Sequence, residues 1–458
     1  MSAPEVMMVL NRFGLGARPG EAEAIASSPD QWLFNQVGQI APGPRLARHA
    51  SSVQILNESW AHAGRSEAIR EKRRTARRQL RRQFRAEVSD RILNAIETDQ
   101  PFAERLVHFW SNHFSVSSSR ATIGTAVGAY EREAIRPHVF GRFSDMLLAV
   151  CQHPCMLVYL DNPQSVGSES RVGKRRGRSI NENLAREVLE LHTVGVNGGY
   201  SQADVIALAE ALSGWSHGGN PGRKARAKGA RPDARFRFVA SRHQPGVKAL
   251  LGKRYADDGA EQARAMLLDL AVRTETANFI AHKLARHFFA DEPPERFVRR
   301  LSSAFEQTGG DLAAVSRTLI ALAFEHASPT EQVNPMRKLK TPHELMVSAY
   351  RSLNVLPARP ARLLGALSQM GHQPFAALSP AGWPDVSSYW LTPETLLRRV
   401  EWARAAATTL PPTIDPRQLL QTALGELASD TTSTWVARAP SPVEAVAMVL
   451  ASHEFQWR

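Results

Sequence analysis

The segment from residue 66 to residue 99 constrains the fold most, because its apolar residues follow a helical period along its whole length. Leu80, Phe84 and Val88 recur every four residues, and the stripe continues to Ile96. Arginine occupies most of the remaining faces. A helix of this kind packs along one narrow side and exposes its other sides to solvent. The segment therefore predicts a long basic helix.

This segment also supplies most of the positive charge of the chain. The 458 residues include 57 lysines and arginines and 44 acidic residues, which gives a net charge of +13. Nine basic residues and one acid fall between Ile69 and Arg85. Phe84 is the one aromatic residue there and lies on the packing stripe, so the stacking surfaces of single-strand-binding proteins are missing, which argues against nucleic acid. A solvated face, or docking of an acidic protein or a membrane surface, remains open. The arginines proposed for docking are Arg77, Arg78, Arg81 and Arg82.

The rest of the chain carries shorter helical patterns separated by proline and glycine. Pro101 suits a first helical position, and the Ser-x-x-Glu pattern from Ser179 to Glu182 is a typical helix start. The runs FRFV and LLGKRY, within 236–255, are the strand candidates. The sequence therefore predicts a mainly α fold: a large multi-helix body with at most one small β-hairpin.

Composition along the chain suggests a main body and an extension. We expect the helical body to span residues 1–354, and a proline-rich helical extension, 355–458, to pack on it. Glycine and arginine accumulate in two stretches of the body. These stretches predict insertion loops at 165–178 and 217–235.

Several protein classes are excluded by what the chain lacks. No run of about 18 apolar residues occurs, so we expect no transmembrane segment. The first residues lack the basic and apolar regions of a secretory signal, which predicts a soluble, cytoplasmic protein, exported only together with a partner. Cys151 and Cys155 have the spacing CQHPC, which is not the redox or zinc CxxC pattern. We expect two buried thiols.

The first group of candidate site residues lies in the helix predicted after Pro101. Glu104, His108 and Asn112 are spaced by four and share a face. His113 lies about 140° around the helix from His108, so the two histidines cannot jointly bind one metal ion without distortion of the helix or outside ligands. One of them could equally be a hydrogen-bonded core residue while the other lines a cleft.

The second group lies in NENLAREVLELHT. Two helical stripes and a histidine at the helix end make up this group: Asn183, Glu187 and Glu190; Glu182, Arg186 and Glu190; and His192. Carboxylates with an imidazole suit general acid–base chemistry or a metal such as Fe, Mn or Zn. The alternative is charge pairing among Glu182, Arg186 and Glu190 on an exposed face, with the histidine on the helix dipole.

A sharper hypothesis joins the two groups in one polar cleft between packed helices. The residues proposed for catalysis are His108, His113, Glu187, Glu190 and His192. The residues proposed to hold a divalent metal ion are His113, Glu187 and His192. The residues proposed to bind a ligand are Asn112, Glu133, Arg136, Asn183 and Arg186. Whether the protein is an enzyme stays open.

Two further sets of residues have simpler interpretations. Glu133 and Arg136 are three apart and are expected to pair, although Arg136 in a cleft could bind an anionic substrate. Lys283 and His287 share a helical face, with Arg286 beside them. We expect their stems to cover apolar neighbours and their tips to lie in water.

The chain also resembles a known family through a combination of short sequences. They are LNRFGLGARPGE, HFWSNHFSVS, EREAIRPHVFGRF, YLDN, NENLAREVLELHTVGVNGGYSQADV, LSGWS, HQPG, GKRY, FIAHKLARHF, TGGDL and GWP. Together they resemble the large bacterial family catalogued as domain of unknown function eighteen-hundred, from about Leu10 to about Arg404. The motif-rich positions of the family fall on His108, Trp110, Asn112, His113, Arg132, Glu133, Arg136, Asn181, Glu182, Asn183, Arg186, Glu187, Glu190 and His192.

The resemblance implies a helical protein and no established activity. It also implies a pairing with a neighbour-encoded protein that resembles phosphatases and sulfatases and carries the export signal. Three functions follow as hypotheses: a His/Glu cleft that binds a metal ion or performs acid–base chemistry, a non-catalytic assembly partner docked through the arginine helix, and nucleic-acid binding through that helix.

Overall fold

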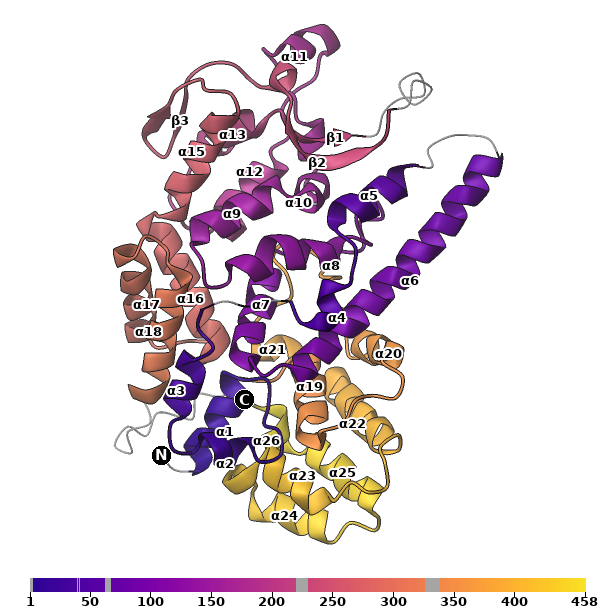
Figure 1. Ribbon diagram of the computed structural model, residues 1–458. Helices are drawn as coiled ribbons and strands as arrows, with labels where there is room; N and C mark the ends of the chain where they lie inside the picture. Colours follow the sequence, from indigo (N-terminus) through magenta and orange to yellow (C-terminus); the bar gives the residue numbers. More distant parts are fainter. Residues whose placement is uncertain (1–2, 39, 41, 62–66, 220–229, 326–337) are drawn as a thin grey trace.

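The computed structural model describes residues 3–38, 40, 42–61, 67–219, 230–325 and 338–458. Over these ranges the chain is mainly α-helical with two small two-stranded sheets, which confirms the predicted fold class (Figure 1). No helix in the described ranges has the length and apolar character needed to cross a membrane.

The helices of the first half of the chain run from the N-terminus to the first sheet. They are α1 (Ala3–Arg12), α2 (Glu21–Ile25), α3 (Pro29–Phe34), α4 (Pro44–Ala47), α5 (Ser52–Ala61), α6 (Glu67–Glu97), α7 (Pro101–His113), α8 (Val127–Tyr130), η1 (Glu131–Ile135), η2 (Arg136–His138), α9 (Phe143–Gln152), α10 (Pro154–Tyr159), η3 (Asn162–Gln164), α11 (Arg171–Arg176), α12 (Asn183–Glu187), η4 (Val188–His192) and α13 (Gln202–Leu212). Of the elements labelled η here, η1 and η4 are π-helices and the others are 3-10 helices.

The helices of the second half follow the first sheet. They are η5 (Ala240–Arg242), α15 (Ala260–Ala271), α16 (Thr274–Phe288), α17 (Glu295–Gln307), α18 (Leu312–Glu325), α19 (Pro342–Leu353), α20 (Ala361–Gln369), α21 (Ser387–Trp390), α22 (Pro393–Ala407), α23 (Pro416–Ala423), η6 (Gly425–Leu427), α24 (Asp430–Ala437), α25 (Pro442–Ala451) and α26 (His453–Gln456).

The strand candidates form two separate antiparallel pairs instead of one hairpin. The strands are β1 (Trp215–Gly219) paired with β2 (Asp233–Phe238), and β3 (Lys248–Leu250) paired with β4 (Lys253–Tyr255). Leu251 and Gly252 have φ angles of 47° and 81°, which suit a tight two-residue turn. The LLGKRY run therefore folds back on itself, and the FRFV run pairs with β1. The loop predicted at 165–178 contains α11, and part of the loop predicted at 217–235 lies outside the described residues.

Buried apolar side chains form two cores. The larger core packs α1, α7, α9, α10, α12, α13 and α15 to α18. The second packs the C-terminal half of α6 against α19, α20 and α22 to α26. The predicted extension therefore shares its core with two helices of the predicted body, and the division after residue 354 stays a prediction.

Helix α7 belongs to the larger core and is nearly all buried. Pro101 occupies its first position, as predicted, because the missing amide hydrogen of proline costs nothing there. Most of its side chains, on every side, are buried, as expected for a central helix. Its partly exposed residues are His108, Ser111 and Asn112, which share one face through their spacing of three and four. This face forms one wall of the pocket described below.

Helix α6 is the predicted basic helix, and it packs as the apolar stripe indicates. Ala76 and Leu80 are buried, whereas Arg77, Arg78, Arg81 and Arg82 are exposed. Its C-terminal half enters the second core, and its N-terminal end lies at the edge of the molecule (Figure 1).

Candidate functional site

A pocket of about 290 Å³ lies where the two cores meet. Its walls come from α7, from α16, and from the segment that contains the start of α19 and the loop before α21. Pockets at the junction of two packed units are common ligand sites. The histidines that line it are His108, His113, His287, His343 and His372.

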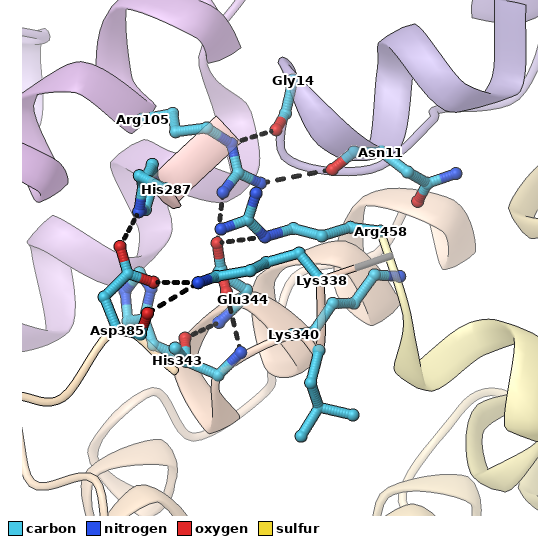
Figure 2. A network of polar contacts seen from close by, with 12 residues as sticks. Asn11, Gly14, Arg105, His287, Lys338, Lys340, His343, Glu344, Asp385 and Arg458 are labelled. Carbon is cyan, nitrogen blue, oxygen red and sulfur yellow. Dashed lines mark hydrogen bonds and ion pairs between the residues drawn. The ribbon is translucent and has the colours of Figure 1, made fainter. Parts of the chain in front are cut away.

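The pocket contains an imidazole held by a carboxylate. Nδ1 of His287 lies 2.8 Å from Oδ2 of Asp385, so Nδ1 carries the proton and donates to the carboxylate. Nε2 of His287 is then an acceptor, and it has no hydrogen-bond partner among the described residues. Figure 2 shows this pair beside Lys338. The arrangement leaves a basic nitrogen free to take a proton from a ligand.

Charges around this pair keep the carboxylate ionised and the imidazole neutral. Lys338 lies 3.1 Å from Asp385 and 2.7 Å from Asp291, and it is 2% exposed. Although burial alone would raise it, His287 and Lys338 hold the pKa of Asp385 well below its usual value. Burial lowers the pKa of His287, and Asp385 only partly opposes that shift. At neutral pH the pair is therefore an imidazole with an aspartate.

A second carboxylate in the pocket wall, that of Glu344, contacts two arginines. Glu344 accepts from Arg105 and lies 3.0 Å from Nε of Arg458. Arg105 also donates to the carbonyl oxygens of Gly14 (2.7 Å) and Asn11 (3.3 Å) (Figure 2). Burial alone would raise the pKa of Glu344, but the two guanidinium groups hold it well below its usual value. Glu344 therefore joins α7, α19 and both ends of the chain.

Glu104, His108 and Asn112, which share the predicted helix face, have three different environments. Glu104 accepts two hydrogen bonds from Arg136, both 2.7 Å long, and its Oε1 lies 3.4 Å from Nε2 of His108. The amide of Asn112 donates to and accepts from the backbone of Trp383 at 2.9 and 2.7 Å. His108 and Asn112 line the pocket, whereas Glu104 holds His108 from behind.

The expected pairing of Glu133 with Arg136 is wrong. Arg136 pairs with Glu104, and Glu133 accepts from Ser52 and lies 3.1 Å from His153. The reason is local, because η1 is a π-helix and the backbone passes directly from it into η2. The spacing of three therefore no longer places the two side chains on one face.

His113 and His192 come together, as the joint hypothesis requires. Nε2 of His113 donates to the carbonyl oxygen of His192 at 3.2 Å, and the two ring centroids are 6.2 Å apart. His113 lines the pocket, whereas His192 is fully buried behind it. Burial lowers the pKa of His192 to about 3 and that of His113 well below its usual value, so both imidazoles are neutral.

The carboxylates of the second group lie elsewhere. Arg186 pairs with Glu182 at 2.7 Å and with Glu190 at 3.4 Å, which is the charge-pairing alternative raised by the sequence. Glu187 is half-buried, and burial with the nearby Glu190 raises its pKa. The backbone amide of Asn183 donates to Asn181. None of these residues lines the pocket.

The positions of the possible ligand side chains bear on the predicted metal site. Within the described ranges, no three His, Cys, Asp or Glu side chains are grouped closely enough to hold a metal ion. The metal site predicted at His113, Glu187 and His192 therefore stays a prediction, and the described residues supply no group of three ligands for it.

The expectation that the tips of Lys283, Arg286 and His287 lie in water is wrong. All three residues line the pocket, and His287 is paired with Asp385. Asp385 lies 98 positions further along the chain, and no helical period reports such a contact.

Several pocket residues escaped sequence reasoning altogether. Glu344 belongs to a capping box with Thr341, a pattern that predicts a helix start but no function. The backbone amide of His343 donates to Nδ1 of His372 at 3.4 Å, and the rings of His108 and His343 are 4.8 Å apart. The GWP sequence that precedes Asp385 contributes to the family resemblance, but its spacing signals no functional site.

Comparison with known proteins gives one match. The model of the family described as "Protein of unknown function (DUF1800)" matches residues 8–457, which confirms the resemblance found in the sequence. No curated protein and no solved structure matches. Because the family model covers nearly all of the chain, the protein belongs to the family "Protein of unknown function (DUF1800)".

Proposed function

We propose that the protein binds a small ligand in the pocket between α7 and α16, and that His287 takes a proton from this ligand as a general base. The observation that carries the proposal is the 2.8 Å contact between Nδ1 of His287 and Asp385, together with the unpartnered Nε2. Asp385 is the positioning residue, since it fixes the tautomer and the orientation of the ring.

The proposal keeps the acid–base chemistry expected from the sequence and places it on a different residue. His108 and His113 remain in the pocket wall, as neutral imidazoles able to contact the ligand. Glu187 and Glu190 have no part in it. The pocket volume of about 290 Å³ is at the lower end of the range for ligand sites, which indicates a small substrate.

The proton position on His287 can be tested without a substrate. Nitrogen-15 NMR at neutral pH should report a neutral ring with the proton on Nδ1 in the wild type. Asp385→Asn should disturb that tautomer, because an amide can offer its NH2 group to Nδ1. An imidazolium at neutral pH, or a proton on Nε2 in the wild type, would contradict the proposal.

The catalytic role can be tested by turnover. A panel of esters, phosphomonoesters and hydroxy acids should include a substrate whose turnover falls at least about a hundredfold in His287→Gln. His282→Gln is the matched control, because His282 lies on the same helix outside the pocket wall. Equal activity in His287→Gln and the wild type would overturn the assignment.

A second candidate function is docking of an acidic partner protein on α6. Arg74 pairs with Glu71 at 3.7 Å, whereas no described acid lies within ion-pair distance of the four arginines proposed for docking. These exposed guanidinium groups, Arg77, Arg78, Arg81 and Arg82, can each bind a carboxylate bidentately. The neighbour-encoded phosphatase/sulfatase-like protein implied by the family resemblance is the partner to try first.

Co-purification tests this docking. Changing the four arginines to glutamate should abolish binding of the partner, and helical content should be unchanged. The control carries the same charge change on the exposed helix α11, at Arg171, Lys174, Arg175 and Arg176. Binding that survives the α6 changes would exclude this surface, and a steep loss of duplex binding with salt would instead indicate nucleic acid.

A further inference from the structure

The charges in the pocket wall do not balance. Two acids and four cations line it. Both acids are occupied, since Glu344 contacts two arginines and Asp385 contacts Lys338 and His287. Both carboxylates therefore already have partners other than the remaining cations of the pocket.

Two of the four cations are already paired. Arg91 donates through Nε to both oxygens of Glu131 at 2.8 and 2.9 Å, and Arg105 pairs with Glu344. Glu131 is itself buried, so this pair is fixed behind the pocket wall. These two side chains shape the pocket and bring no unbalanced charge to it.

The other two cations have no carboxylate partner in the part of the chain that the structure describes. No described acid lies within ion-pair distance of Lys283 or Arg286. The ammonium group of Lys283 lies 5.4 Å from the centroid of the Phe279 ring, and Nε of Arg286 donates to the backbone oxygen of Asp291 at 3.0 Å. The neutral imidazoles around them supply no negative charge. A partly buried cation without a counter-charge is stabilised when an anion binds beside it.

From this imbalance we infer that the ligand carries a carboxylate or phosphate group that binds against Lys283 and Arg286. This inference rests on the proposed function for the pocket and specifies its substrate class. Lys283 and His287 are four residues apart on α16, so their side chains leave the same helix face with Cβ atoms about 5–6 Å apart. The substrate is therefore a small anion whose removable proton lies about one helical turn from its charged group.

Binding of simple anions to the intact protein tests the inference. Inorganic phosphate and malonate serve as probes in separate titrations at constant ionic strength, followed by calorimetry. At least one of them should bind in the millimolar range, and Lys283→Met should weaken that binding about tenfold or more. Lys174→Met is the control, since Lys174 is exposed on α11.

The pH dependence separates an electrostatic role of Lys283 from a structural one. Burial lowers the pKa of Lys283 to about 8, so anion binding should weaken above that pH in the wild type. Lys283→Arg should keep its affinity there, because arginine stays protonated. The charged or titratable groups that face Lys283 are Asp385, Arg286, His113, His192 and His287.

The outcomes distinguish this inference from the proposed function. Anion binding that is lost in Lys283→Met and kept in His287→Gln supports the anion site, whatever becomes of the proton transfer. Whichever of phosphate and malonate binds more tightly identifies the ligand group. Failure of both probes to bind the wild type, or equal binding by wild type and Lys283→Met, overturns the inference and leaves the tautomer test of His287 unaffected.

Discussion

Arg136 donates two hydrogen bonds to Glu104, one from each terminal guanidinium nitrogen to one carboxylate oxygen, and both are 2.7 Å long. Each side chain is 1% exposed. The pair holds the helix that carries His108 against the segment after η1. Because neither charge has access to water, each depends on the other for its stability.

Removing one partner of this pair should cost far more than removing both. Glu104→Leu leaves a buried guanidinium without a counter-charge, so we expect a loss of about 3–5 kcal/mol in the free energy of unfolding. The double variant Glu104→Leu with Arg136→Met should recover much of that loss. Urea denaturation measures both.

The matched control is Arg45→Met, which breaks an ion pair with Glu97 that is about a third exposed on each side. Its cost should stay below about 1 kcal/mol. Equal losses for the buried and the exposed pair would contradict the argument from burial.

Lys340 should make stability depend on pH in the alkaline range. Its ammonium group lies 4.0 Å from the centroid of the Phe455 ring, and burial lowers its pKa to about 7. The unfolded chain keeps this proton up to about pH 10, so between these values the unfolded state binds more protons and stability rises with pH. From about pH 6 to about pH 9, the wild type should gain up to ~3 kcal/mol relative to Lys340→Met.

Unfolding of the two proteins at both pH values gives this difference directly. A difference between wild type and variant that is the same at pH 6 and pH 9 would mean that the folded protein does not lower the pKa of Lys340.

Gly16 should tolerate no side chain. Its φ is +101°, and a Cβ built there would lie 2.6 Å from Cβ and 2.9 Å from Cα of Ser348. Gly16→Ala should therefore lower the free energy of unfolding by more than about 2 kcal/mol. Gly20 has a φ of +76° with no atom within 4 Å of such a Cβ, so Gly20→Ala should cost about 1 kcal/mol. The close contact is disproved if thermal unfolding shows equal losses.

Cys151 and Cys155 should be unreactive in the folded protein. Both side chains are fully buried, and burial raises the pKa of the Cys151 thiol to about 12 and that of Cys155 well above its usual value. Since the thiolate is the reactive form, an aromatic disulfide reagent should label neither thiol under native conditions and both in denaturant. Rapid labelling of either one in the native protein would show that its helix opens.

Local patterns predicted the parts of the structure that depend on nearby residues. The stripe through Leu80 predicted α6, and Pro101 predicted the start of α7. The spacing of four predicted that Glu104 and His108 share a helix face, and in the structure the two side chains are in contact. The two buried thiols were predicted as well.

The parts that escaped prediction depend on insertions in the helical register or on distant contacts. The π-helix η1 moved Arg136 away from Glu133, an event that no periodicity signals. The contacts that build the pocket join residues far apart in sequence. Examples are the contact of His287 with Asp385 and that of Arg105 with Glu344. Which distant elements pack together follows from the whole core and not from the spacing along any one helix.

The network around Glu344 has a consequence for how the protein acquires its pocket. Glu344 contacts Arg105 and Arg458, and Arg105 also binds the carbonyl oxygens of Asn11 and Gly14. Arg105 and Glu344 are 239 positions apart in the sequence. Contacts between such distant residues form slowly, because a long loop must close before they stabilise anything. The binding cavity should thus mature only at the last stage of folding, once the first and final segments have docked, so that partly folded chains cannot hold ligand.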